Sequence, residues 1–182
     1  MKNRDIILLS VLFVALVATR VVLDTPNFNP VGAIAFMGGL LFGRKLIAYI
    51  IPLGLLFIGD FALALSHPEN MEYFLSVSSL FQYASLALII TLGIFMMKKA
   101  TLAKVFGGSI LAAIVFFLVS NAGAWLMLPA YTKDFSGLMN SYEAGLAFFR
   151  ATYGAALVSQ VVFGLGIYIV YSLSTSRKLS LA

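Results

Sequence analysis

Charged residues and cysteine are scarce in this chain. Of its 182 residues, 10% are charged and 62% are hydrophobic, and there is no cysteine. A soluble domain carries about 25% charged residues, and a core of this size cannot shelter so large an apolar fraction from water. The lack of cysteine excludes disulfides, thiolate metal sites and cysteine nucleophiles. The composition therefore predicts an integral membrane protein.

Residue types that carry enzyme chemistry are also few. The single histidine, His67, stands beside Pro68, and the sequence has neither a His-Glu-x-x-His pattern nor a phosphate-binding loop. We therefore expect no enzymatic activity, no metal and no cofactor. The formal net charge of +5 is compatible with nucleic-acid binding. However, the cations occur in short clusters between apolar runs, where they set membrane topology, so we expect no nucleic-acid partner.

Six apolar segments predict an all-α fold, a polytopic bundle of six transmembrane helices forming one membrane domain over residues 1–182. A helix needs about 20 apolar residues to cross about 30 Å of hydrocarbon. The second segment is shorter, so we expect a short or tilted helix whose N-terminus is sheltered by protein. We expect the stretch from Pro129 to Gly145 to fold over the outer face as an interfacial cap. The six segments are 5–23, 30–43, 46–66, 73–97, 105–128 and 146–172.

The positions of the cations favour a topology with both chain ends in the cytoplasm. If the N-terminus is cytoplasmic, nine of the 12 Lys and Arg residues fall on the inner side, which is the usual bias of membrane proteins. We expect a multi-pass protein of the bacterial plasma (inner) membrane. An alternative is that Met1 to Thr19 is a cleaved secretory signal, but its removal would leave five spans and spoil the alternation of charge. The nine inner cations are Lys2, Arg4, Arg44, Lys45, Lys98, Lys99, Lys104, Arg177 and Lys178.

Three ionisable residues are expected at one depth in the outer part of the membrane. A charged side chain at mid-depth costs at least ~2.5 kcal/mol, so each one calls for a partner or a task. Asp60 is expected in the outer third of helix three, and Arg20 and Arg150 near the outer ends of helices one and six. Asp60 could simply pair with one arginine to hold helices together. Two arginines against one carboxylate leave positive charge that would suit an anionic or strongly polar ligand.

The second helix begins at the motif Asn27-Phe28-Asn29-Pro30-Val31-Gly32. The pattern predicts Asn29 as the N-cap and Pro30 as the first helical residue, and capping can be its whole role. Alternatively, a helix N-terminus buried in the membrane directs free N–H groups and partial positive charge into a cavity. In that case Asn27 is the better candidate for ligand contact, because Asn29 is engaged with its own backbone.

Polar residues on the last helices complete the predicted site. Asn121 and Trp125 are four residues apart and share a helix face, although Asn in a span often bridges helices and Trp at a span end is often an anchor. Tyr131 and Tyr142 are expected to line the same pocket, and Gln82 is expected to point inward from helix four. A further inward stripe at helical spacing is predicted in helix six: Arg150, Tyr153, Leu157, Gln160 and Gly164.

Small residues spaced by four are assigned to helix packing, because they let backbones approach where lipid supplies no hydrophobic drive. These are Ala35, Gly39 and Gly43, then Gly108 and Ala112, and Ala151 and Ala155.

The motifs resemble those of a family of small bacterial integral membrane proteins of unknown function. The shared patterns are Asn-Phe-x-Pro-Val-x-Ala, here residues 27–33, an acidic residue at Asp60, and Phe-Phe-x-x-Ser-Asn-x-x-x-Trp, here residues 116–125. The resemblance covers nearly the whole chain. More distantly, the size, helix number and outer polar cluster are similar to S components of energy-coupling-factor vitamin transporters. That likeness implies a pocket open to the outside and an energising partner with ATPases and a coupling membrane subunit.

These patterns together predict a membrane-embedded substrate-binding or transport protein for a small polar or anionic, vitamin-like nutrient, held in the outer half of the bundle. An alternative is a non-transporting structural or assembly partner of other membrane proteins. A proton or ion path through Asp60 would need further titratable groups in the inner half, which the sequence lacks. The predicted site residues are Arg20, Asn27, Asp60, Asn121, Trp125, Tyr131, Tyr142 and Arg150.

Overall fold

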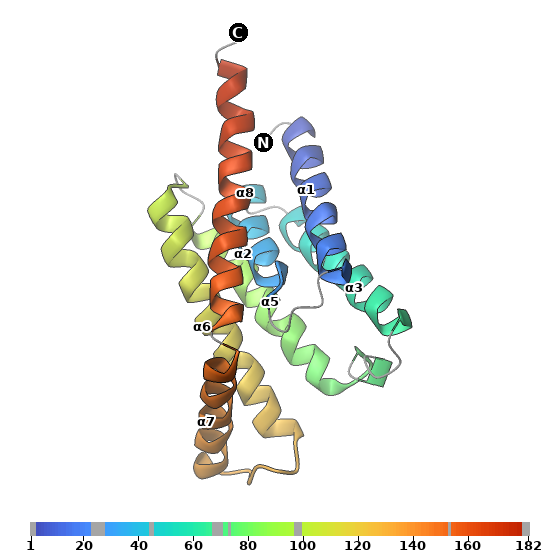
Figure 1. The fold of residues 1–182 in the computed structure, drawn as a ribbon, viewed down its shortest axis with the longest axis vertical. Helices are drawn as coiled ribbons and strands as arrows, with labels where there is room; N and C mark the ends of the chain where they lie inside the picture. Colours follow the sequence, from blue (N-terminus) through green and yellow to red (C-terminus); the bar gives the residue numbers. More distant parts are fainter. Residues whose placement is uncertain are drawn as a thin grey trace.

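The computed structural model is helical throughout the part of the chain that it describes (Figure 1). It describes residues 3–22, 28–43, 46–66, 71–72, 74–96, 100–152 and 154–179, and no strand occurs in these ranges. The predicted all-α class is therefore confirmed. The helices are α1 (Asn3–Val22), α2 (Val31–Phe42), α3 (Ile47–Ser66), α5 (Val77–Met96), α6 (Leu102–Met127), α7 (Phe135–Ala151) and α8 (Ala155–Leu179).

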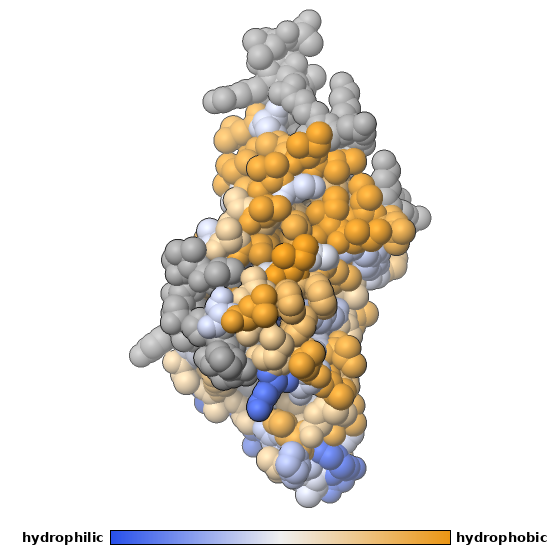
Figure 2. Space-filling model, turned by 90° about the vertical axis from the view of Figure 1, so that its right-hand side faces the viewer, coloured by the Kyte–Doolittle hydropathy of each residue, from blue (hydrophilic) through white to orange (hydrophobic). Residues whose placement is uncertain are grey.

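The surface of the bundle is strongly apolar. Large hydrophobic side chains are exposed along the long helices, among them Phe57 on α3, Phe95 on α5, Phe106 on α6 and Val162 on α8. Figure 2 shows hydrophobic residues over most of the described surface on one side of the molecule, and hydrophilic residues gathered toward its lower end. A water-soluble monomer does not expose so much continuous apolar surface, so these faces are suited to lipid.

Four helices are long and apolar enough to cross a membrane, not the predicted six. Within the described residues these are α3, α5, α6 and the part of α8 from Ala155 to Ser174. The apolar parts of α1 and α2, Ile6–Thr19 and Val31–Phe42, are shorter. The prediction of a membrane bundle holds at this coarser level. In Figure 1, α1 begins and α8 ends at the same end of the molecule, while the turn between α6 and α7 lies at the opposite end.

The short helix α2 is the centre of the bundle. Ten of its twelve residues are buried, and it packs against α3, α5, α6 and α8. Glycines permit this close contact: a Cβ on Gly39 would overlap the backbone oxygen of Ile90 on α5, and one on Gly108 of α6 would overlap the ring of Phe36. The assignment of Gly39 and Gly108 to helix packing is therefore confirmed, and the expected sheltering of the short second helix is observed.

The stretch predicted as an interfacial cap is largely a helix, and this corrects the expected start of the last span. Residues 135–151 form α7, whose N-cap Asp134 accepts a hydrogen bond from the backbone N–H of Gly137 at 2.8 Å. The chain breaks after α7, where Gly154 has a φ of 67° that favours glycine, and α8 begins at Ala155. Ala151 and Ala155 therefore lie on two different helices and do not form one packing pair.

Helix α7 packs on α6 through a stripe of small residues that the sequence analysis overlooked. Gly137, Ser141 and Gly145 are spaced by four, and a Cβ on Gly145 would overlap the side chain of Asn121 on α6. The hydroxyl of Ser141 donates to the backbone oxygen of Asn121 at 2.8 Å. Close approach along this stripe joins α6 and α7 into a hairpin that reaches the lower end in Figure 1.

Candidate functional site

A cavity of about 720 Å³ lies where α2, α5, α6, α7 and α8 meet. Among the described residues, four side-chain amides line it, each from a different segment: Asn29, Gln82, Asn121 and Gln160. The remaining walls are mainly apolar and aromatic, including Phe116 on α6 and Phe148 on α7. None of the described lining residues is Asp, Glu, His, Lys or Arg. The cavity thus combines apolar walls with a few uncharged polar groups, as small-molecule sites commonly do.

The start of α2 forms one wall of this cavity. The Oδ1 of Asn29 accepts a hydrogen bond from the N–H of Val31 at 3.2 Å, and the N–H of Ile34 donates to the oxygen of Pro30 at 2.9 Å. Pro30 is the N-cap residue and Val31 the first helical residue, one position later than predicted. Over the described residues, the N–H groups of Gly32 and Ala33 have no hydrogen-bond acceptor. These two donors carry the partial positive charge of the helix start.

Gln160 of α8 lies directly against that helix start. Its side chain is only 5% exposed, and its Oε1 occupies the space that a Cβ on Gly32 would fill. The Nε2 of Gln160 is buried and has no hydrogen-bond partner in the described part of the chain. A buried donor without a partner costs about 1–3 kcal/mol, so a group that supplies an acceptor there would stabilise the protein.

Most of the other polar side chains of the cavity wall donate hydrogen bonds to protein oxygens. The Nδ2 of Asn121 donates to the oxygen of Phe117 at 2.8 Å, and Gln82 donates to Oδ2 of Asp60 at 3.5 Å. The hydroxyls of Ser120, Thr152 and Ser159 each donate to a backbone oxygen of their own helix. Among the described lining side chains, Gln160 is distinct because its donor is both buried and without a partner.

Asp60 stands behind the cavity wall. The hydroxyl of Tyr83 donates to its Oδ2 at 2.5 Å, and Gln82 also bonds to Oδ2. Asp60 does not itself line the cavity, whereas Gln82 does. Two α5 side chains thus hold the α3 carboxyl group, and Gln82 connects that group to the cavity.

Of the six predicted site residues whose side chains the structure describes, it brings one, Asn121, to the cavity wall. Trp125 instead donates from its Nε1 to the backbone oxygen of Thr132 at 2.8 Å, and Tyr142 donates to the oxygen of Leu118 at 3.2 Å. Tyr131 is half-buried in the turn before α7 and does not line the cavity. These contacts join α6 to the turn and to α7.

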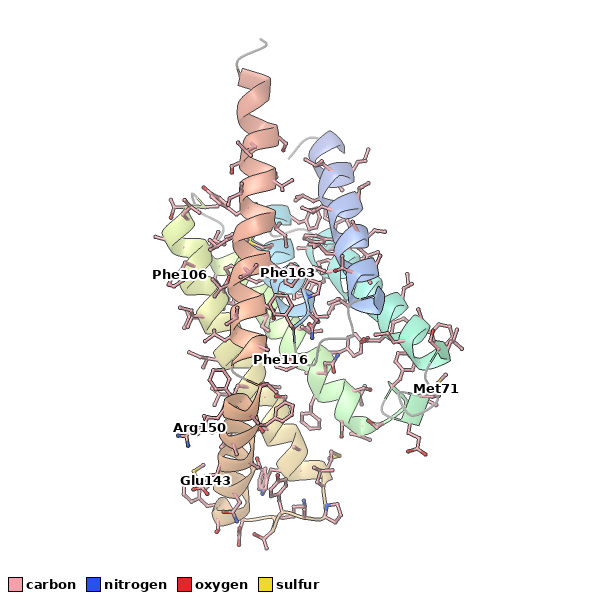
Figure 3. All side chains as sticks on the ribbon, in the orientation of Figure 1. Met71, Phe106, Phe116, Glu143, Arg150 and Phe163 are labelled. Atoms are coloured by element: carbon pink, nitrogen blue, oxygen red, sulfur yellow. The ribbon has the colours of Figure 1, made fainter. Side chains whose placement is uncertain are left out.

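Arg150 lies in the last turn of α7 and is exposed. In Figure 3 its side chain points away from the bundle, on the same side of α7 as Glu143. The prediction that Arg150 lies inside the last span was wrong. The chain breaks between α7 and α8, so Arg150 belongs to α7 and does not share a helix face with the residues of α8. The side chain of Arg20 and the whole of Asn27 lie outside the described residues. The ligand contacts assigned to these residues stay predictions.

The turn between α6 and α7 is held by polar contacts. Lys133 donates from Nζ to the oxygens of Trp125 and Leu128, which end α6, at 2.5 and 2.8 Å. Two hydrogen bonds to the Asp134 carboxylate lower its pKa below the ordinary value. The larger effect comes from the N–H of Gly137 and the smaller from the hydroxyl of Thr132. This turn is therefore an ordered end of the hairpin.

Residues 1–179 match a protein family of unknown function, DUF6580. The chain belongs to the DUF6580 family. This confirms the resemblance to a family of unknown function drawn from the motifs. No curated protein and no solved structure matches the chain. The likeness of this DUF6580 protein to S components stays a prediction from size and helix arrangement.

Sequence reasoning found the cavity residues of this DUF6580 protein only in part. Gln82 and Gln160 were expected to point inward, and both line the cavity, but neither was chosen for the site. Asn29 was predicted as the N-cap, but the N-cap is Pro30; Asn29 precedes it, accepts from the N–H of Val31 and lines the cavity. The sequence feature that could have identified Gln82 and Gln160 is an uncharged amide in the interior of a span. Such a group is costly in hydrocarbon unless it has a hydrogen-bond partner.

Proposed function

We propose that this protein is a membrane-embedded substrate-binding or transport protein that holds a small amphipathic molecule of nutrient size in the cavity between α2 and α8. The observation that carries the proposal is a cavity of about 720 Å³ lined by four side-chain amides within a bundle whose outer surface is apolar. Small-molecule sites typically measure about 300–1,000 Å³ and combine apolar walls with a few polar groups.

The lining favours a molecule that is apolar over much of its length. Ile114, Leu146 and Phe148 line the cavity and are 47%, 50% and 57% exposed, so the cavity is open along α6 and α7. In a membrane these exposed side chains would meet lipid, so this side of the cavity adjoins the bilayer. A strongly charged nutrient fits less well, since no charged residue occurs in the described lining.

The expected orientation places this cavity toward the outside. The cavity is near the start of α2 and of α8 and near the end of α6. With the start of α1 and the end of α8 in the cytoplasm, this is the outer part of the bundle. We propose that α1, with 20 residues, also crosses the membrane, whereas α2, with 12, reaches only part of the way. Residence in the bacterial plasma membrane and an ATPase-containing partner remain parts of this proposal.

Binding accounts for the lining better than catalysis does. The polar side chains of the described wall are amides and hydroxyls, and proton transfer or nucleophilic attack would need a base near them. Amides and aromatic rings are suited to orienting a molecule by hydrogen bonds and contact.

A thermal-shift screen in lipid nanodiscs tests the proposal, using vitamins, metabolites and amphipathic acids, esters and amines. A compound present at one hundred times its Kd adds about 2.7 kcal/mol to the stability of the protein that binds it. Ala113→Phe fills the cavity from α6 and should abolish the shift produced by any compound bound there. Ala103→Phe adds the same ring to an exposed position of α6 outside the cavity and should leave the shift intact.

The result of this pair of variants is decisive. A stabilising compound whose effect disappears in Ala113→Phe and persists in Ala103→Phe supports the cavity as its site. If no compound stabilises the wild-type protein, or if both variants respond like the wild type, the proposed function is wrong.

A further inference from the structure

The cavity has an uneven supply of hydrogen-bond donors. Most described polar side chains of its wall already donate to protein oxygens, as Asn121 does to Phe117. At the start of α2, in contrast, two donors of cavity-lining residues have no acceptor in the described part of the chain: Nε2 of Gln160 and the N–H of Gly32. These unmet donors belong to one place, because the amide of Gln160 lies against Gly32.

The start of α2 and the amide of Gln160 are two independent sources of unpartnered donors. The α2 start supplies N–H groups and partial positive charge because the first turn of any helix leaves donors unused. Gln160 comes from α8, is 5% exposed, and its buried Nε2 makes no hydrogen bond within the described part of the chain. A half-turn of its amide about the terminal bond exchanges Nε2 and Oε1, so the donor can take either position beside Gly32.

We infer that the bound molecule presents a carbonyl-type oxygen, as in a carboxylic acid or an ester, to Gln160 and the first turn of α2. Its apolar part then lies along Phe116, Ile114 and Phe148, between α6 and α7. This inference deepens the proposed function and rests on it. An amine or quaternary ammonium head would meet unmet donors and partial positive charge at the same place, and so would be excluded.

The described wall does not by itself require the oxygen to be charged. The helix start favours a carboxylate, whereas burial in an apolar wall without a charged partner favours an uncharged ester. The common feature of the two is the acceptor oxygen, so the experiment compares both with a cationic probe of the same chain length.

The test measures equilibrium binding of radiolabelled decanoate to the purified protein in phosphatidylcholine nanodiscs, with empty nanodiscs subtracted. Methyl decanoate and decylamine are the competitors. We expect decanoate or methyl decanoate to bind at least about tenfold more tightly than decylamine, a difference of about 1.4 kcal/mol. Which of the two acceptor probes binds more tightly then reports whether the site takes a carboxylate or an uncharged ester.

Variants of Gln160 connect the preference to this amide. Gln160→Leu keeps the bulk and removes the donor, so affinity for the acceptor probes should fall about tenfold while affinity for decylamine stays the same. Gln160→Glu replaces the amide with a carboxyl group and should invert the preference toward decylamine. Ser109→Ala is the matched control, because its hydroxyl is also buried without a partner but does not line the cavity.

The outcomes separate this inference from the proposed function. Absence of saturable binding for both acceptor probes, equal affinity for all three probes, or unchanged binding in Gln160→Leu would each overturn the acceptor-oxygen inference. If Ala113→Phe still abolishes the binding of other compounds, the proposed function stands without it. Loss of acceptor binding in Gln160→Leu but not in Ser109→Ala supports the inference.

Discussion

Gln160 of α8 fills the space that a side chain on Gly32 of α2 would occupy. Its Oε1 lies where the Cβ would be, while its Nε2 is buried without a hydrogen-bond partner among the described residues. Two helices far apart in the sequence thus meet through a glycine and an amide at the wall of a cavity. This arrangement leaves a buried hydrogen-bond donor without a partner at the cavity wall.

We predict that Gln160→Leu raises the free energy of unfolding by about 1 kcal/mol, because it removes a buried donor without a partner. Thermal unfolding in nanodiscs without ligand measures the change. Gain of stability together with loss of binding would identify a residue retained for function. A lower melting temperature would show instead that Gln160 stabilises the fold.

Gly39→Ala should lower the free energy of unfolding by about 3 kcal/mol or prevent folding. The added Cβ would overlap the backbone oxygen of Ile90, and a backbone atom cannot move aside as a flexible side chain can. Gly107→Ala is the control, since nothing lies within 4 Å of its Cβ position. That variant should be as stable as the wild type or up to about 1 kcal/mol more stable. Similar melting temperatures for the two variants would contradict the close packing of α2 on α5.

Tyr83→Phe should lower the free energy of unfolding by about 2 kcal/mol, because a hydrogen bond to a carboxylate contributes about 1.5–3 kcal/mol. The lost bond joins α5 to Asp60 on α3. Tyr49→Phe removes a comparable interhelical bond between uncharged groups, the one to Thr91 at 2.8 Å. It should cost about 1 kcal/mol. Chemical or thermal unfolding of both variants checks the order, and a larger effect for Tyr49→Phe would be contrary to expectation.

The backbone amide of Gly137 should report the titration of Asp134. The N–H of Gly137 and the hydroxyl of Thr132 lower the pKa of this carboxyl group by binding its charged form. Its contribution to the stability of the turn is therefore present above the unfolded value of about 3.9 and is lost as pH falls through the lower folded pKa. In an NMR pH titration, the Gly137 amide shift should have a midpoint below about 3.9.

Two variants check that assignment. Asp134→Asn should abolish the titration of the Gly137 amide, since an amide can still cap α7 but does not ionise. Thr132→Ala should move the midpoint upward, because it removes the second donor to the carboxylate. A midpoint at or above the unfolded value in the wild-type protein would contradict the capped geometry.

The helical class and much of the packing could be predicted from the sequence. Long apolar segments indicate helices because a backbone in hydrocarbon must satisfy its own hydrogen bonds, and this requirement is local to each segment. The same holds for the short buried second helix and for Gly39, since only a small residue allows such close contact. The boundary between α7 and α8 was missed, because the φ of 67° at Gly154 interrupts a sequence that is apolar on both sides.

Whether a residue lines the cavity depends on where its side chain points in the folded bundle, and not only on its residue type. Arg150 and Trp125 have chemistry suited to a ligand, yet one is exposed on α7 and the other bonds to the following turn. Helical spacing relates residues within one helix, but it gives no information on how separate helices are rotated toward one another.

Hydrophobicity and cation placement act residue by residue, so a helical protein suited to lipid follows from the amino-acid order alone. The contact of Gln160 with the start of α2, and the shared cavity of Asn121 and Gln82, emerge only in the folded bundle. Such a meeting depends on the packing of helices far apart in the chain, where small residues set the distance and side-chain volume sets the rotation.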